Sequence, residues 1–129
     1  MWIDGGNGML MGIADRLTVM NILPVEGNYA TLGLIRTLKK QISLTEEDFK
    51  EFRIKMDGEK YFDEETKKEV IVPEGQLHWN KKGNEGKEFE FGIKTEEIIV
   101  DSLKKLESSK KLTMNQFGVY EKFIVNKRR

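Results

Sequence analysis

The chain has 129 residues, with 22 Lys and Arg against 22 Asp and Glu, and it contains no cysteine. Disulfides and thiolate metal sites are therefore excluded, and the balanced formal charge does not indicate a strongly basic nucleic-acid binder. No apolar run reaches the roughly 18 residues of a membrane span, and the first ten residues lack the pattern of a secretory signal. We expect a cytoplasmic protein of one ordinary domain.

The two ends of the chain differ in character from the rest. Residues 1–8 are rich in glycine and follow no hydrophobic pattern, so we predict a flexible arm. Trp2 lies in this arm, and such an aromatic can anchor it to a partner, to a second subunit or to the domain's own surface. Residues 9–125 follow without a linker as one domain, and residues 126–129 form a basic tail.

Helical periodicity dominates the first third of the chain. A stripe at helical spacing predicts a helix over residues 9–23, which Pro24 ends because proline cannot continue the hydrogen-bond pattern. A turn at residues 27–28 precedes a second helix over residues 29–42, with Lys39 and Lys40 in its last turn, where cations suit the helix dipole. Thr45 has the position of a cap for a short third helix.

The pattern then changes to the alternation of strands. Residues 52–56 alternate apolar and charged, and Asp57-Gly58 is typical of a hairpin turn. Further short runs predict strands over residues 59–62, 69–72, 76–80 and 87–93, with the last pairing back across a polar loop. We therefore predict one small antiparallel sheet between residues 52 and 93.

Two helices close the predicted fold. We expect one over residues 96–110, capped by Thr95, and one capped by Thr113. The last helix has its apolar stripe at Met114, Phe117, Tyr120 and Ile124. The predicted class is thus α+β, with an antiparallel sheet or hairpin inserted between N-terminal and C-terminal helices.

Few side chains suggest catalysis. His78 is the one histidine, and in its alternating strand we expect it to face solvent while Trp79 faces the core. No G-x-S-x-G motif accompanies a serine, and the Gly-rich stretch at residues 5–8 has no preceding strand to form a phosphate loop. We predict a protein that is not an enzyme and has no cofactor or metal centre. A magnesium site built from clustered carboxylates stays as an alternative.

Acidic side chains gather in the middle of the chain. Residues 45–75 hold 11 acids against 6 bases, whereas residues 95–129 hold 8 bases against 5 acids. We interpret two clusters as a candidate acidic patch for a protein partner: Glu46, Glu47 and Asp48, and Asp63, Glu64 and Glu65. Solvated faces and the dipole of the short third helix are the competing explanation.

Nucleic-acid binding is the main alternative function. The helices over residues 29–42 and after Thr45, followed by strands, have the order of a winged helix-turn-helix. The segment in the recognition position reads EEDFKEF, however, and acids there would repel phosphate. We therefore favour a protein partner.

Two stretches resemble small uncharacterised proteins encoded by phages and prophages of low-GC bacteria. They are MNILPVEGNYATLGLIRTLKKQISLTEEDFKEF and KKLTMNQFGVYEKF, and the resemblance in segment order covers about residues 12–125. It implies a mobile-element accessory protein that binds or inhibits a host protein, and it brings no catalytic residues. We expect an intracellular binding or regulatory protein, and a homodimer if an exposed sheet edge or helix stripe pairs.

Overall fold

The computed structural model describes residues 8–126, and these residues fall into two compact units. Unit 1 joins the N-terminal part of the chain, up to Ser43, to the part from Gly86 onward. Unit 2 is the segment between them, Leu44–Glu85. The residues that we predicted as one domain over 9–125 therefore divide between two units, while Trp2 and nearly all of the predicted arm lie outside the described residues.

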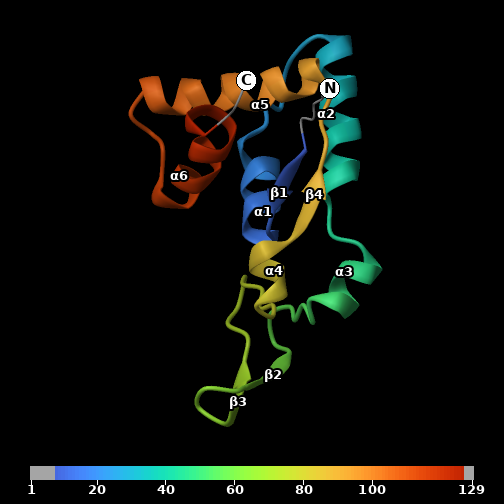
Figure 1. Cartoon of the computed structure of the whole chain (residues 1–129), viewed down its shortest axis with the longest axis vertical. Coiled ribbons are helices and arrows are strands. Elements are labelled where there is room, and N and C mark those ends of the chain that lie inside the picture. The colour runs from blue at the N-terminus through green and yellow to red at the C-terminus, as the bar shows by residue number, and fades with distance from the viewer. Residues whose placement is uncertain (1–7, 127–129) are drawn as a thin grey trace. The chain divides into compact units, whose positions relative to one another are not determined.

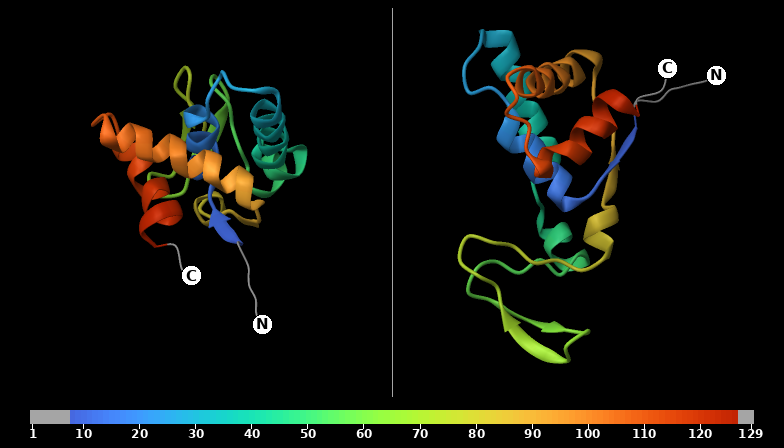
Figure 2. Two further views of the ribbon diagram at one scale, coloured as in Figure 1. Left: turned by 90° about the horizontal axis from the view of Figure 1, so that it is seen from above. Right: turned by 90° about the vertical axis from the view of Figure 1, so that its left-hand side faces the viewer.

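Helices form most of unit 1 (Figure 1). Its elements in chain order are β1 (Met9–Met11), α1 (Ile13–Ile22), α2 (Tyr29–Ile42), β4 (Lys87–Phe89), α5 (Ile93–Ser108), α6 (Met114–Tyr120) and the π-helical turn η1 (Glu121–Val125). Helix α5 crosses both α1 and α2, and α6 packs against α1 (Figures 1 and 2). The α+β class predicted from the sequence is confirmed.

The core of unit 1 lies where these helices meet. It contains residues from every helix of the unit, from strand β1 and from the segment that follows β4: Met11, Val19, Leu23, Ile35, Leu38, Ile42, Phe91, Ile99, Leu103, Val119 and Phe123. Periodicity explains the contribution of the helices, because residues three and four apart share one helical face. Burial of this apolar surface is the main force that holds the unit together.

Strand β1 corrects the predicted start of the first helix. Residues 9–11 pair antiparallel with β4, with Met9 opposite Phe89 and Met11 opposite Lys87. The strand is only three residues long, and its partner lies far away in the sequence, so its apolar run could not be distinguished from a first helical turn. The strand places Met11 in the core and leaves Leu10 half exposed.

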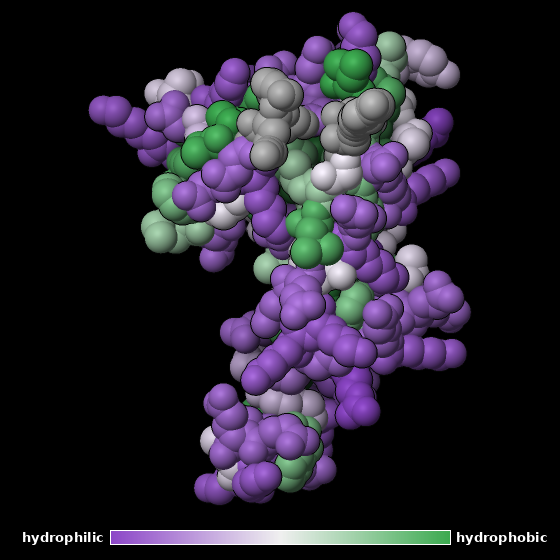
Figure 3. Space-filling model, viewed as in Figure 1, coloured by the Kyte–Doolittle hydropathy of each residue, from purple (hydrophilic) through white to green (hydrophobic). Residues whose placement is uncertain are grey.

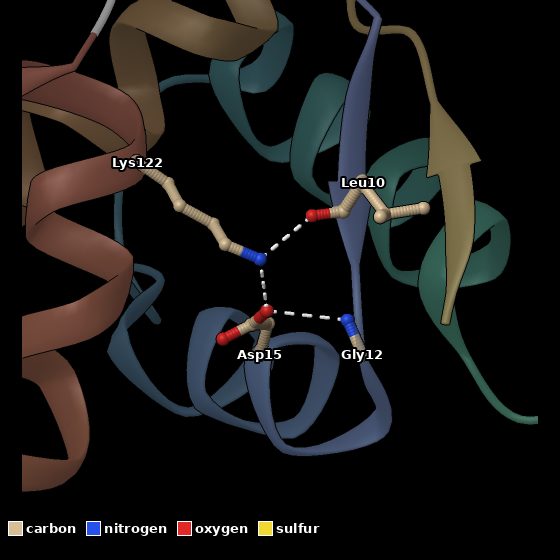
Figure 4. A network of polar contacts seen from close by, with 4 residues as sticks. All are labelled: Leu10, Gly12, Asp15 and Lys122. Atoms are coloured by element: carbon tan, nitrogen blue, oxygen red, sulfur yellow. Dashed lines mark hydrogen bonds and ion pairs between the residues drawn. The ribbon is translucent and has the colours of Figure 1, made fainter. Parts of the chain in front are cut away.

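A lysine from the end of the chain fixes β1 and α1 (Figure 4). The Nζ atom of Lys122 lies 2.6 Å from Oδ2 of Asp15 and donates to the carbonyl of Leu10 at 2.7 Å. The same carboxylate oxygen accepts from the backbone N–H of Gly12 at 3.1 Å, which caps α1. This network ties the C-terminal helical segment to the first strand.

Unit 2 contains α3 (Glu46–Glu51), the hairpin of β2 (Lys60–Asp63) and β3 (Lys68–Ile71), and α4 (Lys82–Glu85). In the hairpin, Lys60 pairs with Ile71 and Asp63 with Lys68. The one continuous sheet predicted between residues 52 and 93 is wrong. Residues 55 and 78 form only an isolated bridge, and β4 pairs with β1 instead of with residues 76–80.

Backbone hydrogen bonds and a few side chains hold unit 2 together. Its buried apolar residues are Phe52, Ile54 and Val72. The backbone of Lys55 exchanges both hydrogen bonds with His78, at 2.8 and 3.0 Å. Unit 2 therefore has a much smaller apolar core than unit 1.

The start of α5 also differs from the prediction. The helix begins at Ile93, with Gly92 as its N-cap, and Thr95 lies inside it. Ile93, the last residue of the strand predicted over residues 87–93, is instead the first residue of this helix and is exposed. By contrast, Thr113 does precede α6, and its N–H donates to Oε1 of Gln116 at 3.0 Å.

Candidate binding surfaces

An open groove lies in unit 1 between α2 and the end of α1. Its volume is about 540 Å³, and its lining comes from the end of α1, the loop after it and one side of α2. The lining residues are Met20, Pro24, Val25, Leu32, Ile35, Arg36, Lys39, Lys40 and Ser43. We call this feature the α1–α2 groove.

Local sequence signals explain why a groove forms here. Pro24 prevents α1 from continuing beyond Ile22, and the chain turns before α2 begins. Asn28 caps α2, because its Oδ1 accepts from the backbone N–H of Thr31 at 2.8 Å. The two helices are therefore separated by a loop that forms one wall of the groove.

A buried arginine holds the other end of α2 against α1. Arg16 is 1% exposed, and its Nε and Nη2 atoms donate to the carbonyls of Ile42 and Ser43 at 2.9 and 2.8 Å. Its guanidinium also lies 5.1 Å from the centre of the Phe89 ring, at a distance suited to a cation–π contact. Because a charged group binds the last carbonyls of α2, the position of this helix relative to α1 is fixed.

The groove has an apolar floor and a basic rim. Ile35 is buried at its base, whereas Val25 is 87% exposed and Leu32 is partly exposed. Arg36, Lys39 and Lys40 lie at i, i+3 and i+4 on α2, so they share one side of the helix. No acidic residue contributes to the lining.

The helix dipole does not account for the whole of this rim. The helix dipole favours Lys39 and Lys40 in the last turn of α2, but it does not account for Arg36 one turn earlier. None of the 14 residues of α2 is Asp or Glu, although acids and bases are equal in number in the whole chain. The helix therefore presents a field of one sign beside exposed apolar side chains.

The predicted acidic patch does not form a single surface. Glu46 and Glu47 are exposed on α3, and Glu64 and Glu65 are exposed at the turn of the β2–β3 hairpin. Asp63 is half buried, and its Oδ1 accepts from the N–H of Glu65 at 2.9 Å. Helix α3 and the hairpin turn lie apart within unit 2 (Figures 1 and 2).

Asp48 does not belong to an accessible surface. Its side chain is 1% exposed, and its Oδ2 accepts from the backbone N–H of Thr45 at 2.9 Å. In return, the N–H of Asp48 donates to Oγ1 of Thr45 at 3.1 Å. These two bonds form a capping box with Thr45, the predicted cap of this helix, and they use the carboxylate inside unit 2.

The chain's one histidine is more enclosed than its strand pattern predicted. The ring of His78 is half buried and stacks on Tyr61, with 3.5 Å between ring centres and 10° between the planes. The neighbouring indole of Trp79 donates to Oδ1 of Asn84 at 2.9 Å. Across residues 8–126, no group of three or more His, Asp or Glu side chains is placed to hold a metal ion.

Comparison with known proteins adds no relative to this description: no family model, curated protein or solved structure matches the chain. Among the helices described, none is long and apolar enough to cross a membrane.

The α1–α2 groove was not found from the sequence. Its lining combines residues from two helices and a loop, and in the sequence the helix dipole alone is sufficient to explain Lys39 and Lys40. The available signal was the absence of any acid from a 14-residue helix that carries three bases. That imbalance indicates an interaction surface only when the exposed apolar residues beside it are known.

Proposed function

We propose that this protein is a non-enzymatic binding module that holds a protein partner in the α1–α2 groove. The observation that supports the proposal is the groove itself, with an apolar floor and a one-sided basic rim of Arg36, Lys39 and Lys40. Exposed apolar side chains that gather beside polar ones are typical of protein interaction sites.

The surroundings of the groove extend this surface. Tyr29, in the first turn of α2, is 94% exposed, and Val25 in the preceding loop is nearly as accessible. A tyrosine offers a large contact area at a low cost in side-chain entropy, which makes it a frequent anchor at interfaces. The resemblance to phage-encoded proteins favours a host protein as the partner.

The exposed acids of unit 2 suggest a second, weaker contact in this proposal. Glu46 and Glu47, or Glu64 and Glu65, are accessible for electrostatic contact with a basic surface. Exposed charges of this kind affect association rates and salt dependence more than affinity. The groove is therefore the site to test first.

Capture from a nuclease-treated bacterial lysate tests the proposal when the wild-type protein is compared with two variants. Leu32→Asp places a charge on the apolar floor, whereas Met114→Asp places the same charge on an exposed residue of α6 outside the groove. We expect a stoichiometric protein partner to be retained by wild type and Met114→Asp and lost by Leu32→Asp. Equal retention by all three proteins would contradict the groove as the site. Recovery of nucleic acid alone, without nuclease, would favour the alternative of a nucleic-acid binder.

A further inference from the structure

We infer that the partner segment held in the α1–α2 groove is an acidic amphipathic helix. The inference rests on the proposed function and goes beyond it by assigning the chemistry and the secondary structure of the segment. Three features of the groove support it: its charge, its floor and the absence of a strand edge in its walls.

The basic rim selects an acidic partner. Arg36, Lys39 and Lys40 lie on the same side of α2, and no acid of the lining offsets them. A carboxylate on the partner gains a charge-assisted hydrogen bond with such a side chain, whereas a lysine or arginine would be repelled. The rim therefore selects strongly for the sign of the partner's charge and only weakly for its exact sequence.

The apolar floor selects an amphipathic partner. Met20, Val25 and Leu32 contribute aliphatic contact area to the lining of the groove. Burial of apolar side chains against this floor supplies affinity, because apolar area removed from water is favourable. The floor contains no aromatic ring on which a nucleic-acid base could stack. A polypeptide with apolar anchors and acidic flanks matches both parts of the surface.

The walls of the groove favour a helix over an extended strand. They consist of the ends and sides of α1 and α2 and the loop between them, without a β-strand. An extended peptide gains much of its affinity from hydrogen bonds to a sheet edge, which this groove does not offer. A helix satisfies its own backbone hydrogen bonds and presents anchors at i, i+3, i+4 and i+7, so it matches the groove better.

A pair of synthetic probes tests the inference directly. Each is a fluorescent helical peptide of about 14 residues, or four turns, with leucines at i, i+3, i+4 and i+7. The acidic probe carries glutamate at the positions that flank the leucine stripe, and the basic probe carries lysine at the same positions. We expect the wild-type protein to bind the acidic probe at least about tenfold more tightly than the basic one, measured by fluorescence anisotropy.

Charge reversal provides the matched comparison. In Lys39→Glu/Lys40→Glu the rim changes sign, and we expect affinity for the acidic probe to fall about tenfold and affinity for the basic probe to rise. The control Lys104→Glu/Lys105→Glu makes the same change of charge on exposed residues of α5 outside the groove, and we expect less than about a twofold effect. Urea denaturation of each variant verifies that it folds.

The outcomes separate this inference from the proposed function. Binding that Leu32→Asp abolishes but charge reversal leaves unchanged keeps the groove as the site and overturns the acidic partner. If neither Leu32→Asp nor charge reversal changes the affinity for either probe, the groove itself is overturned as the site. A dimer in light scattering that dissociates in Lys39→Glu/Lys40→Glu would place a second copy in the groove and overturn a foreign helix as its occupant.

Discussion

The two units of this protein hold their folds by different means. Unit 1 has a continuous apolar core to which every one of its helices contributes. Unit 2 has three buried apolar side chains, Phe52, Ile54 and Val72, together with the buried cap Asp48. In the view of Figure 3, the surface formed by unit 2 is mostly hydrophilic.

This difference shows how a segment without a large core is kept in one conformation. Small domains bury a low fraction of their surface and depend on additional restraints. In unit 2 the restraints are backbone hydrogen bonds between loops, such as the pair between Lys55 and His78, and the side-chain cap of α3. We therefore expect unit 2 to be the less stable part, and unit 1, which carries the α1–α2 groove, to be the rigid one.

The largest effect should come from Gly86→Ala, at the point where the chain enters unit 1. Gly86 has φ of +77°, and a Cβ atom there would lie 1.7 Å from the backbone oxygen of Met11. We expect the pairing of β1 with β4 to be lost, at a cost above about 4 kcal/mol, measured by urea denaturation. Gly58→Ala in unit 2 is the control: its φ is +84° with open space around it, so we expect only about 1 kcal/mol. Similar losses in both variants would contradict this account.

Truncation of a core side chain should destabilise mainly the unit in which that side chain lies. Leu103→Ala in unit 1 and Phe52→Ala in unit 2 each remove a fully buried side chain, at a cost of about 3 to 5 kcal/mol. We expect Phe52→Ala to remove hydrogen-exchange protection from unit 2 while α1, α2 and α5 stay protected, because the core of unit 1 is intact. Leu103→Ala should lower protection throughout unit 1. Loss of protection in both units from Phe52→Ala would show that they unfold as one.

Removal of helix caps should have a smaller effect, and an unequal one. Asp48→Ala breaks the buried capping box of α3, whereas Gln116→Ala removes an exposed acceptor at the start of α6. We expect about 2 kcal/mol for the first and about 0.5 kcal/mol for the second from thermal denaturation, because the first removes a buried hydrogen-bond acceptor and the second a more accessible one. Equal costs would indicate that burial does not strengthen the cap.

A similarly small effect should come from Lys122→Met, within unit 1. The side chains of Lys122 and Asp15 are 37% and 22% exposed, so water screens their ion pair. We expect a loss of about 0.5 to 1 kcal/mol at low salt and less at high salt, measured by urea denaturation at two ionic strengths. A loss several times larger would show that this network holds β1 in place by more than electrostatics.

Local signals in the sequence predicted local features well. Pro24 ends α1, Thr45 caps α3, and α6 begins after Thr113. Each of these features depends on residues within one or two turns of each other, which is the range over which sequence patterns act. The α+β class followed from the change between helical and alternating periods.

Pairing between distant segments was not predictable from those signals. Strand β1 exists because residues 9–11 meet β4 about 80 positions later in the chain, and a three-residue run has no period of its own. The buried Arg16 is a further example, since its acceptors are the carbonyls of Ile42 and Ser43. The α1–α2 groove involves only residues between Met20 and Ser43, but which of them line it depends on how α1 packs against α2, and the helical period alone does not specify that packing.

The most direct test of the central claim is an NMR titration of the isotope-labelled protein with the acidic amphipathic probe. We predict that the amide signals of residues around the groove, including Val25, Leu32 and Arg36, shift with saturation, while those of α6 and of unit 2 stay in place. Shifts centred on α6 or on the β2–β3 hairpin, with the groove signals unchanged, would contradict the groove as the binding site.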